Sequence, residues 1–149
     1  MCIFRAVPKW LSKDASAVLR TAEAQARARR HAVGTPHLLL GVLADEHGAG
    51  AHVLQAMGFD VRQVRYQAAR VVGPTSSRPS RRRPVYSRRA EAILSRALGE
   101  AQAQGRRAIE PADLLLAIVT EPEGKAASIL TALRPSADES RVTVDLTAD

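Results

Sequence analysis

Four histidines are the side chains in this sequence that could most readily bind a metal ion or transfer a proton near neutral pH. They are His31, His37, His47 and His52, and no two of them are spaced four residues apart. Because a zinc site needs several histidine or cysteine ligands at helix or turn spacing, we predict no metal site and no cofactor. His37 is interpreted instead as a residue at the start of a helix.

Hydroxyl and carboxylate side chains do not form a catalytic set in this sequence either. No serine stands in the strand-to-helix elbow of a hydrolase nucleophile, and Glu91, Glu100 and Glu110 fall where helix surfaces or ends are expected. Gly124 and Lys125 lack both the upstream glycine spacing and the following hydroxyl of an ATPase phosphate-binding loop. We therefore predict no catalytic residues and expect that the chain is not an enzyme.

Arginine provides the remaining chemical signal. The formal net charge is +7, and it is concentrated: residues 62 to 89 contain no acidic residue and nine arginines, at positions 62, 65, 70, 78, 81, 82, 83, 88 and 89. Clustered arginines can bind nucleic-acid phosphates by releasing counterions. The run 78–83 can also be a solvated linker, which the lack of interleaved aromatic residues favours. A basic helical nucleic-acid-binding protein that uses Arg78–Arg89 is therefore the alternative hypothesis.

The elements that carry these residues are predicted to be helices. Aromatic residues make up only 3% of the chain, while alanine, leucine, arginine and glutamine are abundant. Thr35 followed by Pro36 is typical of a helix start, with Thr35 as the N-cap residue. The apolar run 38–43 is too hydrophobic for an exposed helix. The stretch 33–57 is therefore predicted to be a buried helical hairpin.

This hairpin occurs twice in the sequence. An ungapped shift of 76 residues places residues 33–57 on residues 109–133, with three leucines falling on three leucines and Gly48 falling on Gly124. The same shift extended backwards pairs Trp10 with Tyr86. This register predicts an internal duplication.

The duplication predicts one compact all-α domain over residues 1–149, built from two pseudo-repeats of about four helices each. Repeat 1 is expected at 10–72 and repeat 2 at 86–142, joined by an Arg/Pro/Ser linker at 73–85 that cannot pack a core. A short helix and a loose tail, 143–149, are expected at the end. One cysteine, no signal peptide and no long apolar run indicate a cytoplasmic protein without a membrane span.

The residues of the hairpin resemble the amino-terminal (Clp repeat) domain of Clp unfoldases, in particular the ClpC type. The resemblance covers about residues 10–133 and rests on Gly34-Thr35-Pro36-His37-Leu38-Leu39-Leu40-Gly41 and on Tyr86-Ser87-Arg88-Arg89-Ala90. It implies an all-helical domain that docks adaptors and substrate proteins, including arginine-phosphorylated ones in some members. It also implies, for actinobacterial members, binding of cyclic-peptide antibiotics.

The sequence departs from this family at the glutamate that holds the guanidinium of phosphoarginine. Pro36 and Ala112 stand at the two positions, and neither can offset a cation. At the phosphate end the second half keeps Ser87 and Arg89, whereas the ungapped shift places Leu11 and Lys13 at the same positions in the first half.

The resemblance to this family, together with the absence of catalytic and ATP-binding motifs, predicts a non-enzymatic protein- or peptide-binding module without the ATPase modules of an unfoldase. Its partners are expected to be a Clp unfoldase, the clients or adaptors of that unfoldase, or cyclic-peptide antibiotics. We expect the ligand to bind in a groove between two helix starts, lined by Trp10, Lys13, Tyr86, Ser87 and Arg89. For Trp10 and Tyr86 themselves, capping of the core is the favoured interpretation and a role in binding is the alternative.

Overall fold

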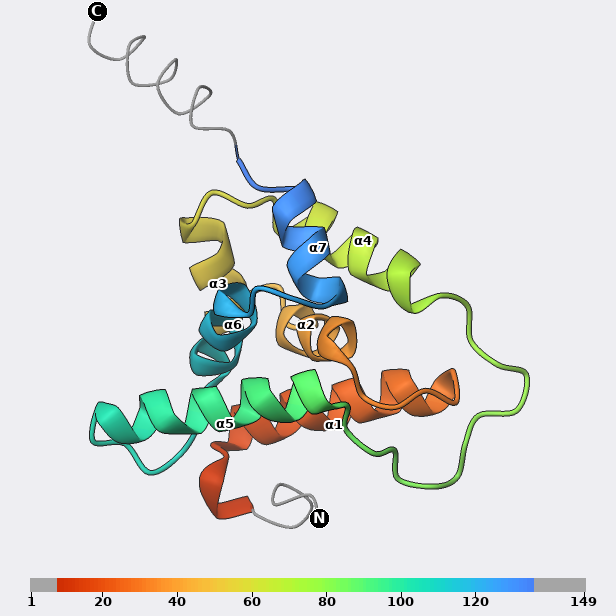
Figure 1. Cartoon of the computed structure of the whole chain (residues 1–149), viewed down its shortest axis with the longest axis horizontal. Coiled ribbons are helices and arrows are strands. Elements are labelled where there is room, and N and C mark those ends of the chain that lie inside the picture. Colours follow the sequence, from red (N-terminus) through yellow and green to blue (C-terminus); the bar gives the residue numbers. More distant parts are fainter. Residues whose placement is uncertain (1–7, 136–149) are drawn as a thin grey trace, which may run out of the picture.

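The computed structural model describes residues 8–135, which form an all-α fold (Figure 1). Seven α-helices follow a short 3-10 helix at Pro8–Trp10. They are α1 (Lys13–Ala28), α2 (Thr35–Leu43), α3 (Ala49–Ala56), α4 (Val61–Val72), α5 (Arg88–Ala103), α6 (Pro111–Thr120) and α7 (Lys125–Ala132).

The two leucine-rich helices, α2 and α6, lie at the centre of the domain. Helix α2 packs against α1 and α4, helix α6 packs against α5 and α3, and the two central helices also contact each other. Leu38 and Leu39 of α2, like Leu114 and Leu115 of α6, are completely buried. The first helix of each predicted hairpin is therefore buried in a core that both halves share, whereas the second helix, α3 or α7, is buried along one side only.

Helices α1 and α2 approach each other closely because of Gly41. A Cβ atom at this position would lie 2.5 Å from the carbonyl oxygen of Val18, a distance that no side chain can accept. The glycine thus allows α2 to lie against the backbone of α1 and fixes where the start of α2 is placed.

Each half of the chain provides backbone partners for the other half. Ser12 N donates to Ile109 O at 2.9 Å, and Ile109 N donates to Trp10 O at 2.6 Å. The same pattern recurs where Val33 N donates to Val85 O at 2.8 Å and Ser87 N donates to Val33 O at 2.9 Å. The segment before each long helix is therefore paired with the loop before the central helix of the opposite half.

The predicted register of 76 residues is correct for the central hairpins but wrong by one residue for the long helices. Ser12 and Ser87, which are 75 residues apart, are the equivalent N-caps: each hydroxyl accepts a hydrogen bond from the backbone N–H three residues later. The second half has one additional residue between Arg106 and Ile109.

The shifted register changes which residues correspond. Leu11, which pairs with Ile109, is the counterpart of Tyr86, which pairs with Val33. The predicted equivalence of Trp10 and Tyr86 is therefore wrong. Ser12, and not Leu11, stands in the place of Ser87.

The linker between the halves is packed more closely than predicted. Ser76 N donates to Ala28 O at 2.8 Å and Ser80 N donates to Arg27 O at 2.9 Å, so the linker covers the C-terminal end of α1. The expected helix after residue 134 and the expected tail at 143–149 lie outside the described residues. No helix within residues 8–135 is long and apolar enough to cross a membrane.

Candidate functional site

A pocket of about 440 Å³ lies where the first turns of three helices meet, and we call it the three-helix pocket. Figure 1 shows the starts of α7, α2 and α5 following one another down the centre of the view. The lining residues come from both halves of the chain and include no carboxylate; they are His31, Ala32, Gly34, Thr35, Pro36, His37, Ser87, Arg88, Arg89, Gly124 and Lys125.

Helix α5 contributes a capped first turn with two arginines. Ser87 is the N-cap, and its hydroxyl accepts a hydrogen bond from Ala90 N at 3.2 Å. Arg88 and Arg89 follow directly and are exposed. Arg89 donates to Glu123 at 2.9 Å, but both side chains of this ion pair are largely exposed, so water screens the interaction and Arg89 can exchange partners.

Gly34 is the N-cap of helix α2, and its backbone N–H donates to Nδ1 of His37 at 2.9 Å. Because Nδ1 accepts, the proton of the neutral ring is assigned to Nε2. The ring is only 4% exposed and lies edge-on to His31, with ring centroids 5.7 Å apart. Burial, together with the positive charges of His31, Arg29 and Lys125, lowers the pKa of His37 to about 4.

Helix α7 begins against α2, and Thr35 joins the two. The predicted role of Thr35 as N-cap of its own helix is wrong, because Gly34 is the N-cap of α2. The buried hydroxyl of Thr35 instead accepts a hydrogen bond from Ala126 N at 3.1 Å, in the first turn of α7. Gly124 has φ of 109°, and a Cβ atom there would lie 3.2 Å from this hydroxyl.

The three-helix pocket is suited to an anionic group. The first backbone N–H groups of a helix have no intrahelical partners, and the helix dipole favours negative charge at that end. Three helix starts converge on the pocket, and Arg88, Arg89 and Lys125 add full positive charges. The ring of Pro36 provides apolar surface beside them.

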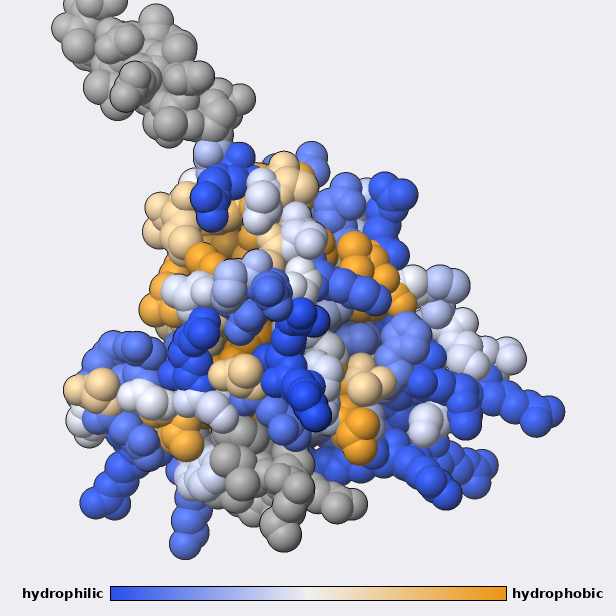
Figure 2. Space-filling model, in the orientation of Figure 1, coloured by the Kyte–Doolittle hydropathy of each residue, from blue (hydrophilic) through white to orange (hydrophobic). Residues whose placement is uncertain are grey.

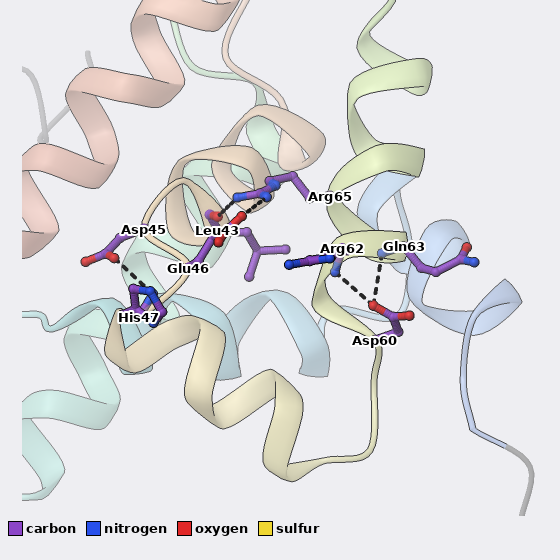
Figure 3. Close-up of polar contacts among 8 residues, drawn as sticks. All are labelled: Leu43, Asp45, Glu46, His47, Asp60, Arg62, Gln63 and Arg65. Atoms are coloured by element: carbon purple, nitrogen blue, oxygen red, sulfur yellow. Dashed lines mark hydrogen bonds and ion pairs between the residues drawn. The ribbon is translucent and has the colours of Figure 1, made fainter.

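The equivalent region of the other half is acidic. A pocket of about 230 Å³ there is lined by Asp14, Asp45, Gly48, Ala49 and Glu110, among other residues. Figure 3 shows one edge of this region, where the Asp45 carboxylate accepts a hydrogen bond from His47 N at 3.0 Å. The two halves therefore share a backbone plan, but the charged residues that line the two equivalent pockets are acidic in one and basic in the other.

Arg106 and Asp113 take the places of His31 and His37 in this second half. The Asp113 carboxylate accepts from Glu110 N at 2.8 Å, as His37 accepts from Gly34 N. It also pairs with both terminal nitrogens of Arg106, at 2.6 and 2.7 Å. Hydrogen bonds from Arg106 hold the pKa of Asp113 below its usual value.

The structure assembles the predicted site residues only in part. Ser87 and Arg89 line the three-helix pocket, whereas Trp10, Lys13 and Tyr86 do not. Trp10 packs against the core beside Ile109, and Lys13 is the exposed first residue of α1. The Tyr86 hydroxyl donates to Glu23 at 2.7 Å. The predicted groove lined jointly by the two long-helix starts is thus not the pocket around Ser87 and Arg89.

Sequence reasoning missed the contributions of Gly34, His37 and Lys125 to the pocket. The signal in the sequence is the start of the last helix. Gly124-Lys125 lacks the motif of an ATPase phosphate-binding loop, but a glycine before a helix also marks the end of the helix whose first N–H groups have no intrahelical partners.

Among residues 8–135, no group of three or more His, Cys, Asp or Glu side chains could hold a metal ion.

Comparison with known proteins identifies the family. The family model of the Clp repeat (R) N-terminal domain matches residues 10–133. The chain belongs to the Clp repeat N-terminal domain family. It is 31% identical over 143 residues to the chloroplastic chaperone protein ClpC1 of Oryza sativa subsp. japonica, an alignment that covers 95% of this chain. The chain spans only 16% of the length of that relative.

Solved structures show the same Clp repeat fold. The N-terminal domain of the ClpV1 ATPase from the Escherichia coli EAEC Sci1 T6SS matches with a TM-score of 0.67 at 23% identity, covering 94% of this chain and 87% of that domain. The N-terminal domain of ClpD from Arabidopsis thaliana matches with a TM-score of 0.66 at 16% identity, covering 97% and 99% of the two chains.

Proposed function

We propose that this Clp repeat domain is a non-enzymatic module that binds proteins and peptides through the three-helix pocket. The observation that carries the proposal is the convergence of three helix starts and three cationic side chains on a pocket without a lining carboxylate. Such a pocket favours an anionic group on a peptide, because the positive ends of three helix dipoles and three cationic side chains lie around the same space.

The favoured ligand carries an anion without an adjoining cation. Pro36 lines the pocket at the position where the family's phosphoarginine clamp has glutamate, so a bound guanidinium would find no carboxylate there. A phosphate or carboxylate group on a peptide needs no such partner. We therefore propose acidic or phosphorylated peptides as the ligand class. The C-terminal carboxylate of a partner protein could serve as the anionic group in the same way.

The family suggests where this binding acts. We propose that the module affects which clients or adaptors reach a Clp unfoldase, by delivering them or by competing for them. A second form of the same role is sequestration of cyclic-peptide antibiotics that target the unfoldase. Both roles need binding alone and no chemical step.

Titration of the isotope-labelled protein with a phosphopeptide and its unphosphorylated form tests the ligand class. We expect amide shifts at Arg88, Lys125 and His37, which line the pocket, and a loss of affinity of about tenfold or more when Lys125 and Arg89 are both replaced by glutamate. The matched control replaces the exposed Arg107 and Arg62 by glutamate and should bind nearly as well as the parent. Equal losses in both double variants would reject the pocket as the site.

The role is tested with purified components. A Clp unfoldase–protease degrading a model client should change its rate when the parent protein is added, and not when the Lys125 and Arg89 double variant is added. An unchanged rate with the parent protein, with or without an adaptor or a cyclic-peptide antibiotic present, contradicts the proposed role while leaving the ligand titration to judge the pocket.

A further inference from the structure

A second cationic surface lies at the C-terminal end of α1, in a segment that we call the arginine lobe (residues 76–83 together with Arg30). Its backbone is fixed by two hydrogen bonds to the end of the helix: Ser76 N donates to Ala28 O, and Ser80 N donates to Arg27 O. The last carbonyl groups of a helix lack intrahelical partners, so these bonds satisfy both the helix end and the lobe.

Side-chain contacts also hold residues 73–83 against the domain, at the start, the middle and the end of this stretch. Arg29 Nε donates to Gly73 O at 2.7 Å, and Arg30 Nη1 donates to Arg78 O at 3.0 Å. Arg83 pairs at 3.1 Å with Glu23, a carboxylate of α1 that is only 8% exposed. The arginine lobe is therefore held against the domain in one conformation.

The exposed side of the arginine lobe is a concave cationic surface. A pocket of about 620 Å³ is lined by Arg30, Arg78, Pro79, Ser80, Arg81 and Arg82 and by no acidic residue. Figure 2 shows hydrophilic side chains projecting from this end of the molecule. Within residues 8–135, the guanidinium groups of Arg78, Arg81 and Arg82 form no ion pair, whereas Arg65, Arg83, Arg89 and Arg106 do.

The arginine lobe holds like charges close together, although they repel each other. Four guanidinium groups around one pocket repel each other, and the docked backbone keeps the Cα atoms that carry them close together. A bound anion removes the repulsion, and because the lobe is already ordered, little conformational entropy is lost on binding. The guanidinium fork also matches a carboxylate with two parallel hydrogen bonds.

We propose that the arginine lobe binds an acidic segment of a partner protein, at a site separate from the three-helix pocket. Two features favour a peptide over nucleic acid. No aromatic side chain lines the pocket to stack on bases, and the arginines surround one concavity rather than a stripe that follows a phosphate backbone. The arginine lobe and the three-helix pocket share no lining residue.

Fluorescence anisotropy with a labelled oligoglutamate peptide tests the proposal on the full chain with Lys125 and Arg89 replaced by glutamate, so that the three-helix pocket does not contribute to binding. This double variant is the parent for the comparisons below. We expect the triple variant Arg78→Ala, Arg81→Ala and Arg82→Ala to bind at least about tenfold more weakly than the parent. The matched control replaces Arg62, Arg70 and Arg107, three exposed arginines outside the lobe, by alanine and therefore loses the same net charge. The control should keep most of the affinity, and equal losses in both variants would overturn the proposal.

A second variant separates geometry from charge. Glu23→Gln raises the net positive charge but removes the ion pair between Glu23 and Arg83, so simple electrostatics predicts tighter binding, whereas a preorganised lobe predicts weaker binding. Weaker binding at an unchanged thermal midpoint supports the proposal, and tighter binding overturns it. A duplex DNA of matched charge is titrated in parallel; if it binds more tightly than the peptide and depends on the same three arginines, nucleic acid is the ligand and the proposal fails.

Discussion

At the scale of single residues, the two halves perform one structural task with different chemistry. His37 and Asp113 each accept a hydrogen bond from the backbone N–H at the start of their own helix. The histidine does so as a neutral ring, and the aspartate does so as a carboxylate paired with Arg106. The two helix starts should therefore respond differently to acid.

Acidification should weaken the fold through His37. Its pKa is lowered to about 4 in the folded state from 6.5, so the unfolded chain takes up a proton first. Stability contributed by the neutral ring is complete above pH 6.5 and is lost as the pH falls toward 4, by an amount on the order of 3 kcal/mol. Urea unfolding at a series of pH values measures this loss.

His37→Gln provides the matched comparison, because a glutamine at this position keeps an acceptor for Gly34 N but does not titrate between pH 6.5 and 4. Its stability curve should be flatter over that window. His47→Gln, at an exposed histidine, should leave the slope unchanged. A slope that is the same in the parent and in His37→Gln would contradict the assignment.

Residue roles were predictable only where the partner is local in sequence. The serine before each long helix and the acidic cap Asp60 can be recognised from the residues that follow them, and Figure 3 shows Asp60 accepting from the N–H groups of Arg62 and Gln63. Thr35 also has the composition of a cap. Its actual partner, Ala126 N, is 91 residues away, and no local rule identifies it.

At the scale of elements, helix starts connect the two halves of this domain in addition to the packed helix faces. The starts of α2, α5 and α7 meet at one pocket, and the start of α7 depends on a hydroxyl from α2. An N-cap hydrogen bond contributes about 1 kcal/mol when its donor is otherwise unpaired. Contacts between helix starts thus couple the two halves energetically.

Thr35→Val should uncap α7 without changing the shape of the side chain. The buried Ala126 N–H then loses its acceptor, so we expect a loss of about 1–2 kcal/mol and faster amide exchange in the first turn of α7. Hydrogen-exchange mass spectrometry or NMR measures the exchange, and denaturation measures the stability. Thr131→Val, at an exposed residue of the same helix, is the control and should change neither.

The helices themselves were predictable, whereas their exact correspondence was not. The hairpin predicted at 33–57 contains α2 and α3, and its copy at 109–133 contains α6 and α7. The ungapped register misplaced the long helices by one residue because the additional residue lies in a loop, after Arg106, where amphipathic patterns give no signal. The docking of the linker was missed because its partners are backbone carbonyl groups of α1, which composition does not reveal.

At the scale of the whole molecule, the two halves bury equivalent residues unequally. Leu40 of α2 is 8% exposed, while its counterpart Leu116 of α6 is 46% exposed. Helix α4 packs against α2, and the second half has no fourth helix within residues 8–135. The apolar side chains of the first half are therefore more completely covered by the described part of the chain.

The unequal burial predicts unequal costs of truncation. Leu40→Ala should destabilise the domain by about 2–5 kcal/mol, since it removes buried methyl groups and leaves a cavity. Leu116→Ala should cost less than about 1 kcal/mol, as expected for a partly exposed side chain. Chemical denaturation of both variants measures the difference. Equal costs would show that Leu116 is covered in the intact protein.

The crossed pairing of the halves also has a consequence for how such a domain can be divided. Residues 11–12 rely on Ile109, Val33 relies on residues 85–87, and the start of α7 relies on Thr35. Half a chain on its own would lack these partners, and a second identical copy arranged by a twofold axis would supply them. A symmetric homodimer is thus an assembly available to a single unit, and fusion of two such units into one polypeptide preserves the backbone bonds that recur in both halves while freeing each copy to acquire its own charge.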